Sequence, residues 1–226
     1  MLRACYRNGE AMTPVESDNR PLYRTLQPFV LASASPRRKE LLHSVGLNFE
    51  VAVSGINEEA KAGEFPDEAA RRWATEKAKS VARMHENRWI LAADTIVVLG
   101  GVIFGKPGGP EEAASMLKQL NGRSHDVITG MCLMHLRRGA VRLESVRTAV
   151  QFRNVGHDEI LAYVRTGEPL DKAGAYGVQG LGAFLVRSIC GSYTNVVGLP
   201  LCLTLEWLLK EGVIAPLGVE GFLAET

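Results

Sequence analysis

The chain has 226 residues, which is long enough for one large domain with a substantial hydrophobic core. Its 46% hydrophobic and 23% charged residues are typical of a soluble globular protein. The formal net charge of +1 argues against duplex nucleic acid or an anionic membrane as a partner, so any affinity for phosphate groups must come from a local cluster of cations.

Residues 1–27 are polar and include the acids Glu10, Glu16 and Asp18, which fits neither a secretory signal nor an organelle transit peptide. We predict a poorly ordered extension there, and Met12 is an alternative start of translation. No segment approaches the roughly 20 apolar residues of a membrane span. The four cysteines are scattered and form no CxxC pair, which predicts a reducing, cytoplasmic compartment.

A short apolar strand over residues 29–32 leads directly into a helix predicted over residues 36–45. Ser35 is the expected N-cap, Pro36 suits the first helical position, and Gly46 follows the end of the helix. A strand that passes straight into a helix start places free backbone N–H groups beside that junction.

The first turn of this helix carries three cations, Arg37, Arg38 and Lys39, where the helix dipole favours acids. Together with the hydroxyl of Ser33, such a start would form a cradle for a polyphosphate. The alternative is a solvated basic turn without a ligand.

A second extended segment over residues 49–53 precedes a longer helix predicted over residues 66–84. Lys77 lies four residues after Trp73 and four before Val81, so it falls on the apolar stripe and faces the core or a cleft. A lysine that extends its ammonium group to solvent from the edge of the stripe is the alternative.

Residues 89–99 form the most strand-like run in the chain, and Gly100-Gly101 turns it into a hairpin with residues 102–104. Asp94 interrupts this apolar strand, and a carboxylate there is costly unless it is paired, bound to metal or facing a cavity. The alternative for this residue is a buried structural ion pair.

A regular hairpin register places Lys106 opposite Thr95, one position from Asp94, whereas a one-residue bulge would place it on the same face as Asp94. The residues from Gly100 to Lys106 also match the first part of a P-loop. We reject that interpretation because Pro107 follows in place of Ser or Thr, and no helix begins there.

The glycine-rich segment, residues 167–182, contains two side chains suited to a nucleotide base. Gln179 offers donors and an acceptor for a base edge, and Tyr176 could stack on the ring. A tyrosine that packs in the core is an equal alternative. The five histidines show no metal-ligand spacing, and no pattern for acyl transfer is present.

The remaining periodic segments complete an α/β (mixed α+β) fold, in which helices flank a mixed sheet. The predicted domain covers residues 28–212, between the extension and a tail of residues 213–226. The further elements are a helix from Pro110 that ends at Asn121-Gly122, strands over 127–136 and 141–152, a helix over 158–165, a strand over 184–189 and a helix over 201–210.

Several separate motifs resemble those of the Maf nucleotide pyrophosphatases, in the order of that family, from about Phe29 to Leu209. The similar stretches are Leu31-Ala32-Ser33-Ala34-Ser35-Pro36-Arg37-Arg38, Glu76-Lys77-Ala78, Ala93-Asp94-Thr95, Gly105-Lys106-Pro107, Ser124-His125, the glycine-rich segment and Gly191-Ser192-Tyr193 with Asn195-Val196-Val197-Gly198-Leu199-Pro200.

The resemblance implies a two-lobed fold like that of the inosine triphosphate pyrophosphatases, with the nucleotide in a central cleft and often a homodimer. It implies Asp94 as the proton acceptor and as a metal ligand. The phosphate- or metal-site residues that it implies are Ser33, Arg38, Lys77, Lys106 and Glu58. Glu58 rests on a shorter match, residues 56–59, and would be the second metal ligand beside Asp94.

Three positions resemble the branch of the family that acts on dTTP and UTP, and they are Arg37, Thr95 and Gln179. The sequence therefore predicts a hydrolase that converts these nucleotides, or modified pyrimidine nucleotides, to the monophosphate and pyrophosphate as nucleotide-pool housekeeping. Mg²⁺ or Mn²⁺ is the expected cofactor.

Two other functions stay open at this point. One is a non-catalytic nucleotide-binding regulator of cell division, acting in septum formation. The other is an enzyme that cuts at the γ-phosphate and releases orthophosphate. All three interpretations require the cations and Asp94 to meet at one cleft.

Overall fold

The computed structural model of the chain describes residues 6–7, 10–11, 21–59, 61 and 63–218. Along the chain its elements are β1 (Tyr6–Arg7), β2 (Glu10–Ala11), β3 (Tyr23–Thr25), β4 (Phe29–Leu31), α1 (Pro36–His43), β5 (Glu50–Val51), α2 (Pro66–Ala82), β6 (Trp89–Leu99), β7 (Val102–Phe104), α3 (Pro110–Leu120), β8 (Ser124–His135), β9 (Ala140–Phe152), α4 (His157–Arg165), the 3₁₀ turns η1 (Glu168–Asp171), η2 (Ala173–Ala175) and η3 (Gly180–Leu185), β10 (Val186–Cys190), α5 (Tyr193–Val197), α6 (Leu201–Lys210) and β11 (Ile214–Pro216).

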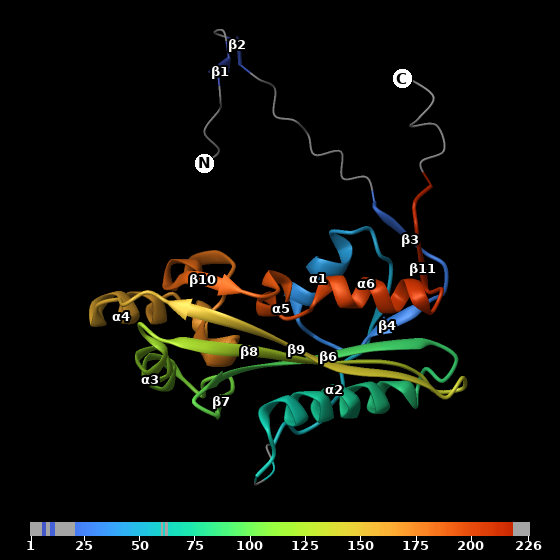
Figure 1. Cartoon of the computed structure of the whole chain (residues 1–226), viewed down its shortest axis with the longest axis horizontal. Helices are drawn as coiled ribbons and strands as arrows, with labels where there is room; N and C mark the ends of the chain where they lie inside the picture. The colour runs from blue at the N-terminus through green and yellow to red at the C-terminus, as the bar shows by residue number, and fades with distance from the viewer. Residues whose placement is uncertain (1–5, 8–9, 12–20, 60, 62, 219–226) are drawn as a thin grey trace.

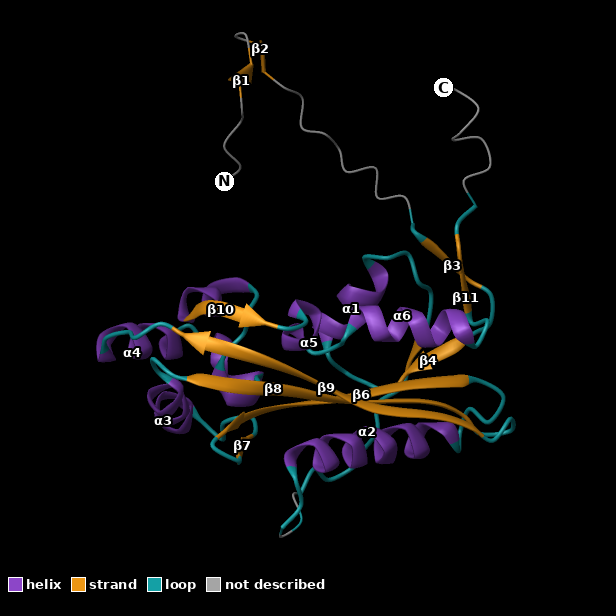
Figure 2. Ribbon diagram, in the orientation of Figure 1, coloured by secondary structure: helices purple, strands orange, loops and turns teal. Residues whose placement is uncertain are grey.

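The main sheet of the described residues has seven strands in the order β10-β9-β8-β6-β4-β5, with β7 added to β6. Strand β4 pairs in parallel with β5 and β6, and the other pairs in this sheet are antiparallel. The mixed sheet flanked by helices that the sequence predicts is confirmed (Figures 1 and 2).

Helix α2 covers one face of the sheet, and α1, α5 and α6 lie over the other (Figure 1). The alternation of side chains along a strand explains this division. On β6, Ile90 and Ala92 pack with the alanines of α2, whereas Leu91 and Ala93 pack in the cluster that includes α1 and α6. Even-numbered residues of β6 therefore face α2, and Asp94 continues that series.

The end of the sheet formed by the start of β8 and the end of β9 has its own core under α3 and α4. Leu117, Phe152, Tyr163 and Leu185 belong to that core, which also includes residues of the glycine-rich segment. The molecule thus has a lobe at each end of the long strands, as the resemblance implies (Figure 2).

One edge of β6 is left open between these two lobes. Strand β4 pairs with β6 only over residues 89–91, and β7 pairs with it only over residues 97–99. On the other side, β8 pairs with β6 continuously. Residues 93–96 of β6 therefore have no neighbouring strand on this edge. The chain leaves the edge after β4, where it continues into α1, and β7 ends at Phe104 before it reaches these residues.

Several element boundaries differ from those that the sequence predicts. The first helix ends at His43 rather than at residue 45, because Leu47 N–H donates to the Leu42 carbonyl and Gly46 takes a positive φ of 88°. The strand predicted over 184–189 begins at residue 186, after the η3 turn. Helix α5 was not predicted.

The predicted extension and tail meet in the structure. Strand β3 pairs antiparallel with β11, so residues 23–25 and 214–216 form a two-stranded ribbon outside the predicted domain of residues 28–212. The prediction of poor order for residues 1–27 falls largely on residues outside those described. In the part of the chain that is described, no helix has the length and apolar character needed to cross a membrane.

Candidate functional site

A hollow of about 850 Å³ opens at the unpaired edge of β6, between the two lobes. It receives side chains from both faces of the sheet because the strand that would separate them is missing there. The site residues that the family resemblance implies all line this hollow, namely Ser33, Arg37, Arg38, Glu58, Lys77, Asp94, Thr95, Lys106 and Gln179.

Asp94 and Lys77 form the most buried ion pair of this hollow. Asp94 is 4% exposed, and Lys77 comes from α2, which covers the same face of β6. Lys77 Nζ also lies 2.7 Å from Glu58 Oε1, in the loop before α2. The ammonium group thus joins two carboxylates and offsets much of the cost of burying Asp94. The expectation that Lys77 faces a cleft is confirmed.

Gly130 allows α2 to lie this close to the sheet. It is the β8 residue directly opposite Asp94, and a Cβ on it would lie 2.1 Å from the carbonyl oxygen of Ala70 in α2. The close approach of helix and sheet brings Lys77 within reach of Asp94.

Arg38 is buried on the opposite face, beside Thr95. Its Nε donates to the Gly198 carbonyl at 2.7 Å, and its two terminal nitrogens donate to the hydroxyls of Ser33 and Thr95 at 3.0 Å each. Burial lowers the pKa of the Arg38 guanidinium, while the carboxylates of Asp94 and Glu58 oppose that shift. The neutral acceptors fix the position of the group without cancelling its charge.

The start of α1 differs in one detail from the prediction. Ser35 stands at the N-cap, but its side chain makes no cap hydrogen bond, and its N–H donates instead to the Ser33 hydroxyl at 3.2 Å. Lys39, the third cation of the first turn, does not line the hollow. Arg37 does, and it is an intermediate, partly exposed residue.

Lys106 and Gln179 are exposed residues on the wall of the hollow, whereas Asp94 is buried. Lys106 follows β7, whose pairing with β6 ends at Phe104. The turn of the hairpin uses Gly100 and Gly101 at positive φ, as predicted, and this confirms that residues 100–106 are not a P-loop. The Gly174 N–H donates to the Gly105 carbonyl at 3.0 Å and ties the glycine-rich segment to this wall.

Tyr176 is a packing residue rather than a free platform for a base. It is 6% exposed, its ring meets Phe152 edge-on at 4.7 Å, and its hydroxyl is 2.9 Å from His125 Nε2. Burial lowers the pKa of His125 to about 4, so this histidine is neutral and bonds to the tyrosine near pH 7.

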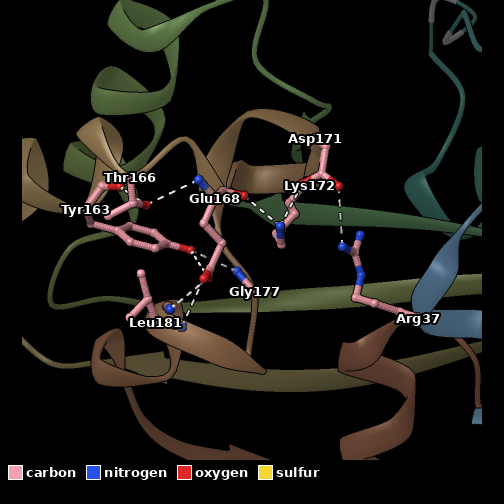
Figure 3. Close-up of polar contacts among 9 residues, drawn as sticks. Arg37, Tyr163, Thr166, Glu168, Asp171, Lys172, Gly177 and Leu181 are labelled. Carbon is pink, nitrogen blue, oxygen red and sulfur yellow. Dashed lines mark hydrogen bonds and ion pairs between the residues drawn. The ribbon is translucent and has the colours of Figure 1, made fainter. Parts of the chain in front are cut away.

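Three charged residues of the hollow carry no predicted role, and these are Glu168, Asp171 and Lys172. Lys172 Nζ donates to the Glu168 carbonyl and to Asp171 Oδ1, each at 2.6 Å. Asp171 also approaches Arg37 (Figure 3). Their charges within a glycine-rich loop were the only signal in the sequence, and it did not separate them from solvated loop residues.

Residues 28–211 match the family model described as Maf-like protein. The chain is 48% identical over 186 residues to the dTTP/UTP pyrophosphatase of Syntrophus aciditrophicus, covering 82% of this chain and 91% of that protein. It is 50% identical over 185 residues to the dTTP/UTP pyrophosphatase of Geobacter sulfurreducens, covering 82% and 97%. Among solved structures, a HAM1 protein from Coxiella burnetii overlaps with a TM-score of 0.45 at 19% identity, over 82% of this chain and all of that one.

Proposed function

Because this chain belongs to the family of Maf-like proteins, we propose that its hollow binds dTTP and UTP and hydrolyses them to the nucleoside monophosphate and pyrophosphate. The observation that carries the proposal is the meeting of Arg38, Lys77, Asp94 and Lys106 at one hollow. The relatives that are about half identical over nearly their whole length carry this activity in their names.

The proposed reaction begins with a water molecule beside Asp94. The Asp94 carboxylate takes a proton from the water while the oxygen of that water bonds to the α-phosphorus. The bond from the α-phosphorus to the bridging oxygen breaks, and pyrophosphate leaves with the electron pair. Lys77 holds the carboxylate in place, since its ammonium group contacts Asp94 directly.

The cations of the hollow stabilise the charge that develops on the phosphates. Arg38 is fixed by three neutral acceptors, so it needs no rearrangement to meet a phosphate oxygen. Lys106 is exposed at the wall and can follow the departing pyrophosphate.

The carboxylates fit a hard divalent cation such as Mg²⁺ or Mn²⁺. Glu58 and Asp94 both reach the Lys77 ammonium, so their oxygens converge on one region. Among the described residues no group of three or more His, Cys, Asp or Glu side chains could hold a metal by itself, so phosphate oxygens and water would complete the coordination. When bound, the cation would neutralise negative charge on the phosphates.

Recognition of the base is assigned to Gln179, supported by Arg37 and Thr95. Thymine and uracil present two carbonyl acceptors and one N–H donor, and an amide side chain offers both kinds of partner. Gln179 is exposed on the wall of the hollow, where a base could reach it. A homodimer and a cytoplasmic location stay predictions from the sequence.

Phosphorus NMR of reactions with dTTP, UTP, GTP and 7-methyl-GTP in the presence of Mg²⁺ tests the proposal. We expect pyrophosphate and the monophosphate, with dTTP and UTP turned over fastest. Orthophosphate as the first product would contradict the assigned bond, and the reverse ranking of bases would contradict the assigned specificity. Binding without turnover of any nucleotide would favour the regulator of cell division.

A further inference from the structure

The carboxylate of Glu168, in η1, holds a part of the chain 13 residues further on. Its Oε2 accepts the N–H of Leu181 at 3.0 Å, and its Oε1 accepts the N–H of Gly182 at 2.9 Å. Oε1 also accepts the hydroxyl hydrogen of Tyr163 at 2.9 Å (Figure 3). Both oxygens of the carboxylate are therefore engaged by the protein.

Tyr163 holds the other end of the same stretch. Its hydroxyl accepts the N–H of Gly177 at 3.3 Å while it donates to Glu168. The backbone of residues 177–182 is thus fastened at both ends to one hydroxyl–carboxylate pair. Gln179, the residue assigned to the base, lies between the two points of attachment.

Glycines make this close contact of backbone and side chains possible. A Cβ on Gly182 would lie 2.4 Å from the Tyr163 hydroxyl oxygen, and one on Gly180 would lie 2.9 Å from Glu168 Oε2. Gly180 also has a φ of 73°, in the left-handed region. The glycines at these positions therefore permit the contacts with Tyr163 and Glu168, which a side chain there would obstruct.

The protonation states suit these roles near pH 7. Burial opposes ionisation of Glu168, but the hydrogen bonds from Gly182, Leu181 and Tyr163 outweigh it and lower the pKa of this carboxyl. Burial and the bond to Glu168 raise the pKa of Tyr163, which keeps its proton as a donor. Glu168 is thus a charged acceptor, which forms stronger bonds than a neutral one.

We propose that Glu168, together with Tyr163, is a positioning residue for Gln179 and thereby sets which base the hollow accepts. It acts by holding residues 177–182 in the conformation in which Gln179 lines the hollow. This inference rests on the proposed function, because it concerns base selection by the same site.

The test is the ratio of kcat/KM for dTTP to that for GTP in Glu168→Gln. This change keeps the size of the side chain but replaces one of its two acceptor oxygens by an NH₂ group. That group cannot accept a hydrogen bond from a backbone N–H, so one of the bonds to Leu181 or Gly182 is lost. We expect the ratio to fall about tenfold, with the value for GTP nearly unchanged. Tyr163→Phe removes the hydroxyl and with it two hydrogen bonds, the one donated to Glu168 and the one accepted from Gly177. It should move the ratio in the same direction, and it serves as the test if the first variant does not fold.

A double-mutant cycle separates positioning from a structural role. If Glu168 acts through Gln179, then Glu168→Gln should not lower the ratio further in a Gln179→Ala background. Glu159→Gln is the matched control, because Glu159 also accepts a backbone N–H, from Gly156 at 3.0 Å, but belongs to α4 and does not line the hollow. Equal losses with dTTP and GTP, or additive effects of the two changes, would overturn the inference.

Calorimetric binding of dTMP and GMP keeps the test independent of turnover. If the wild-type chain releases no pyrophosphate, the proposed activity fails, yet the ratio of the two dissociation constants still reports on base selection. A fall in the ratio of the GMP dissociation constant to the dTMP dissociation constant in Glu168→Gln supports positioning. A ratio that is the same in the wild type and in Glu168→Gln contradicts it.

Discussion

Arg37 and Asp171 join the two walls of the hollow, with Arg37 Nη1 lying 3.6 Å from Asp171 Oδ2 (Figure 3). Arg37 stands in the first turn of α1, and Asp171 ends the η1 turn of the glycine-rich segment. Asp171 also accepts from Lys172, so one carboxylate neutralises two cations at the site of the proposed triphosphate.

Asp171→Asn should therefore strengthen nucleotide binding. Removing the acid leaves the positive charges of Arg37 and Lys172 without this counterion, so the hollow attracts the triphosphate more strongly. We expect the KM for dTTP at low ionic strength to fall by a factor of about 2 to 5. The gain should shrink as salt screens the charges. Asp158→Asn, at an exposed position in the first turn of α4, is the control. A higher KM would show that Asp171 itself contributes to binding.

Asp94→Asn should lower kcat by about 10²- to 10⁴-fold, because the amide cannot accept a proton from water. The fold should persist, since Lys77 keeps its contact with Glu58. Steady-state kinetics and circular dichroism measure the two effects. Asp126→Asn removes a carboxylate that pairs with Arg147 outside the hollow, and it should leave kcat unchanged. Near-normal turnover of Asp94→Asn would remove this residue from the role of base.

Gly130→Ala should lower the free energy of unfolding by about 1–3 kcal/mol, because the added methyl group overlaps the backbone of α2. The displaced helix should also carry Lys77 away from Asp94 and reduce kcat. Urea denaturation and kinetics measure both losses. Gly55→Ala, with no atom within 4 Å of the new Cβ, should change stability little. Full stability of Gly130→Ala would contradict the close packing of α2 on β8.

Acid should destabilise the fold through His125. The unfolded chain binds a proton on this residue below pH 6.5, whereas burial lowers the pKa in the fold to about 4. Its contribution is therefore fully present above pH 6.5 and falls as the pH drops through this window, by about 3 kcal/mol at pH 4.

His125→Gln removes the titrating group and should flatten this part of the pH profile. Denaturant titrations of both proteins between pH 7 and 4 give the difference in slope. Parallel profiles would mean that His125 is not protonated preferentially in the unfolded chain.

Removal of divalent cations should stop turnover, and Mg²⁺ or Mn²⁺ should restore it. Glu58→Gln should weaken binding of Mn²⁺ in the presence of dTMP at least about tenfold, as measured from the paramagnetic resonance of free Mn²⁺. Glu59→Gln changes the adjacent carboxylate, which accepts from Asn57 and does not line the hollow, and should have little effect. Undiminished turnover in a chelator would contradict the proposed cofactor.

The sequence alone determined the local elements and the residue types of the site. The apolar run of residues 89–99, the Gly100-Gly101 turn and the helical spacing around Lys77 depend on neighbours within a few residues, so they can be read from the chain. Asp94 stood out for the same reason, since it interrupts an apolar run. Gln179 was marked by the glycine-rich segment around it, whereas Glu58 came from the family motifs alone.

Only the tertiary structure decided how these parts meet. The gap at the edge of β6 arises because β4 and β7 leave it at different points, and Glu168 reaches Leu181 and Gly182 only after the segment has folded back on itself. The ribbon of β3 and β11 joins residues 189 to 193 positions apart along the chain. Such contacts depend on backbone hydrogen bonds and close packing between distant segments, and residue spacing carries no information on which distant groups will pair.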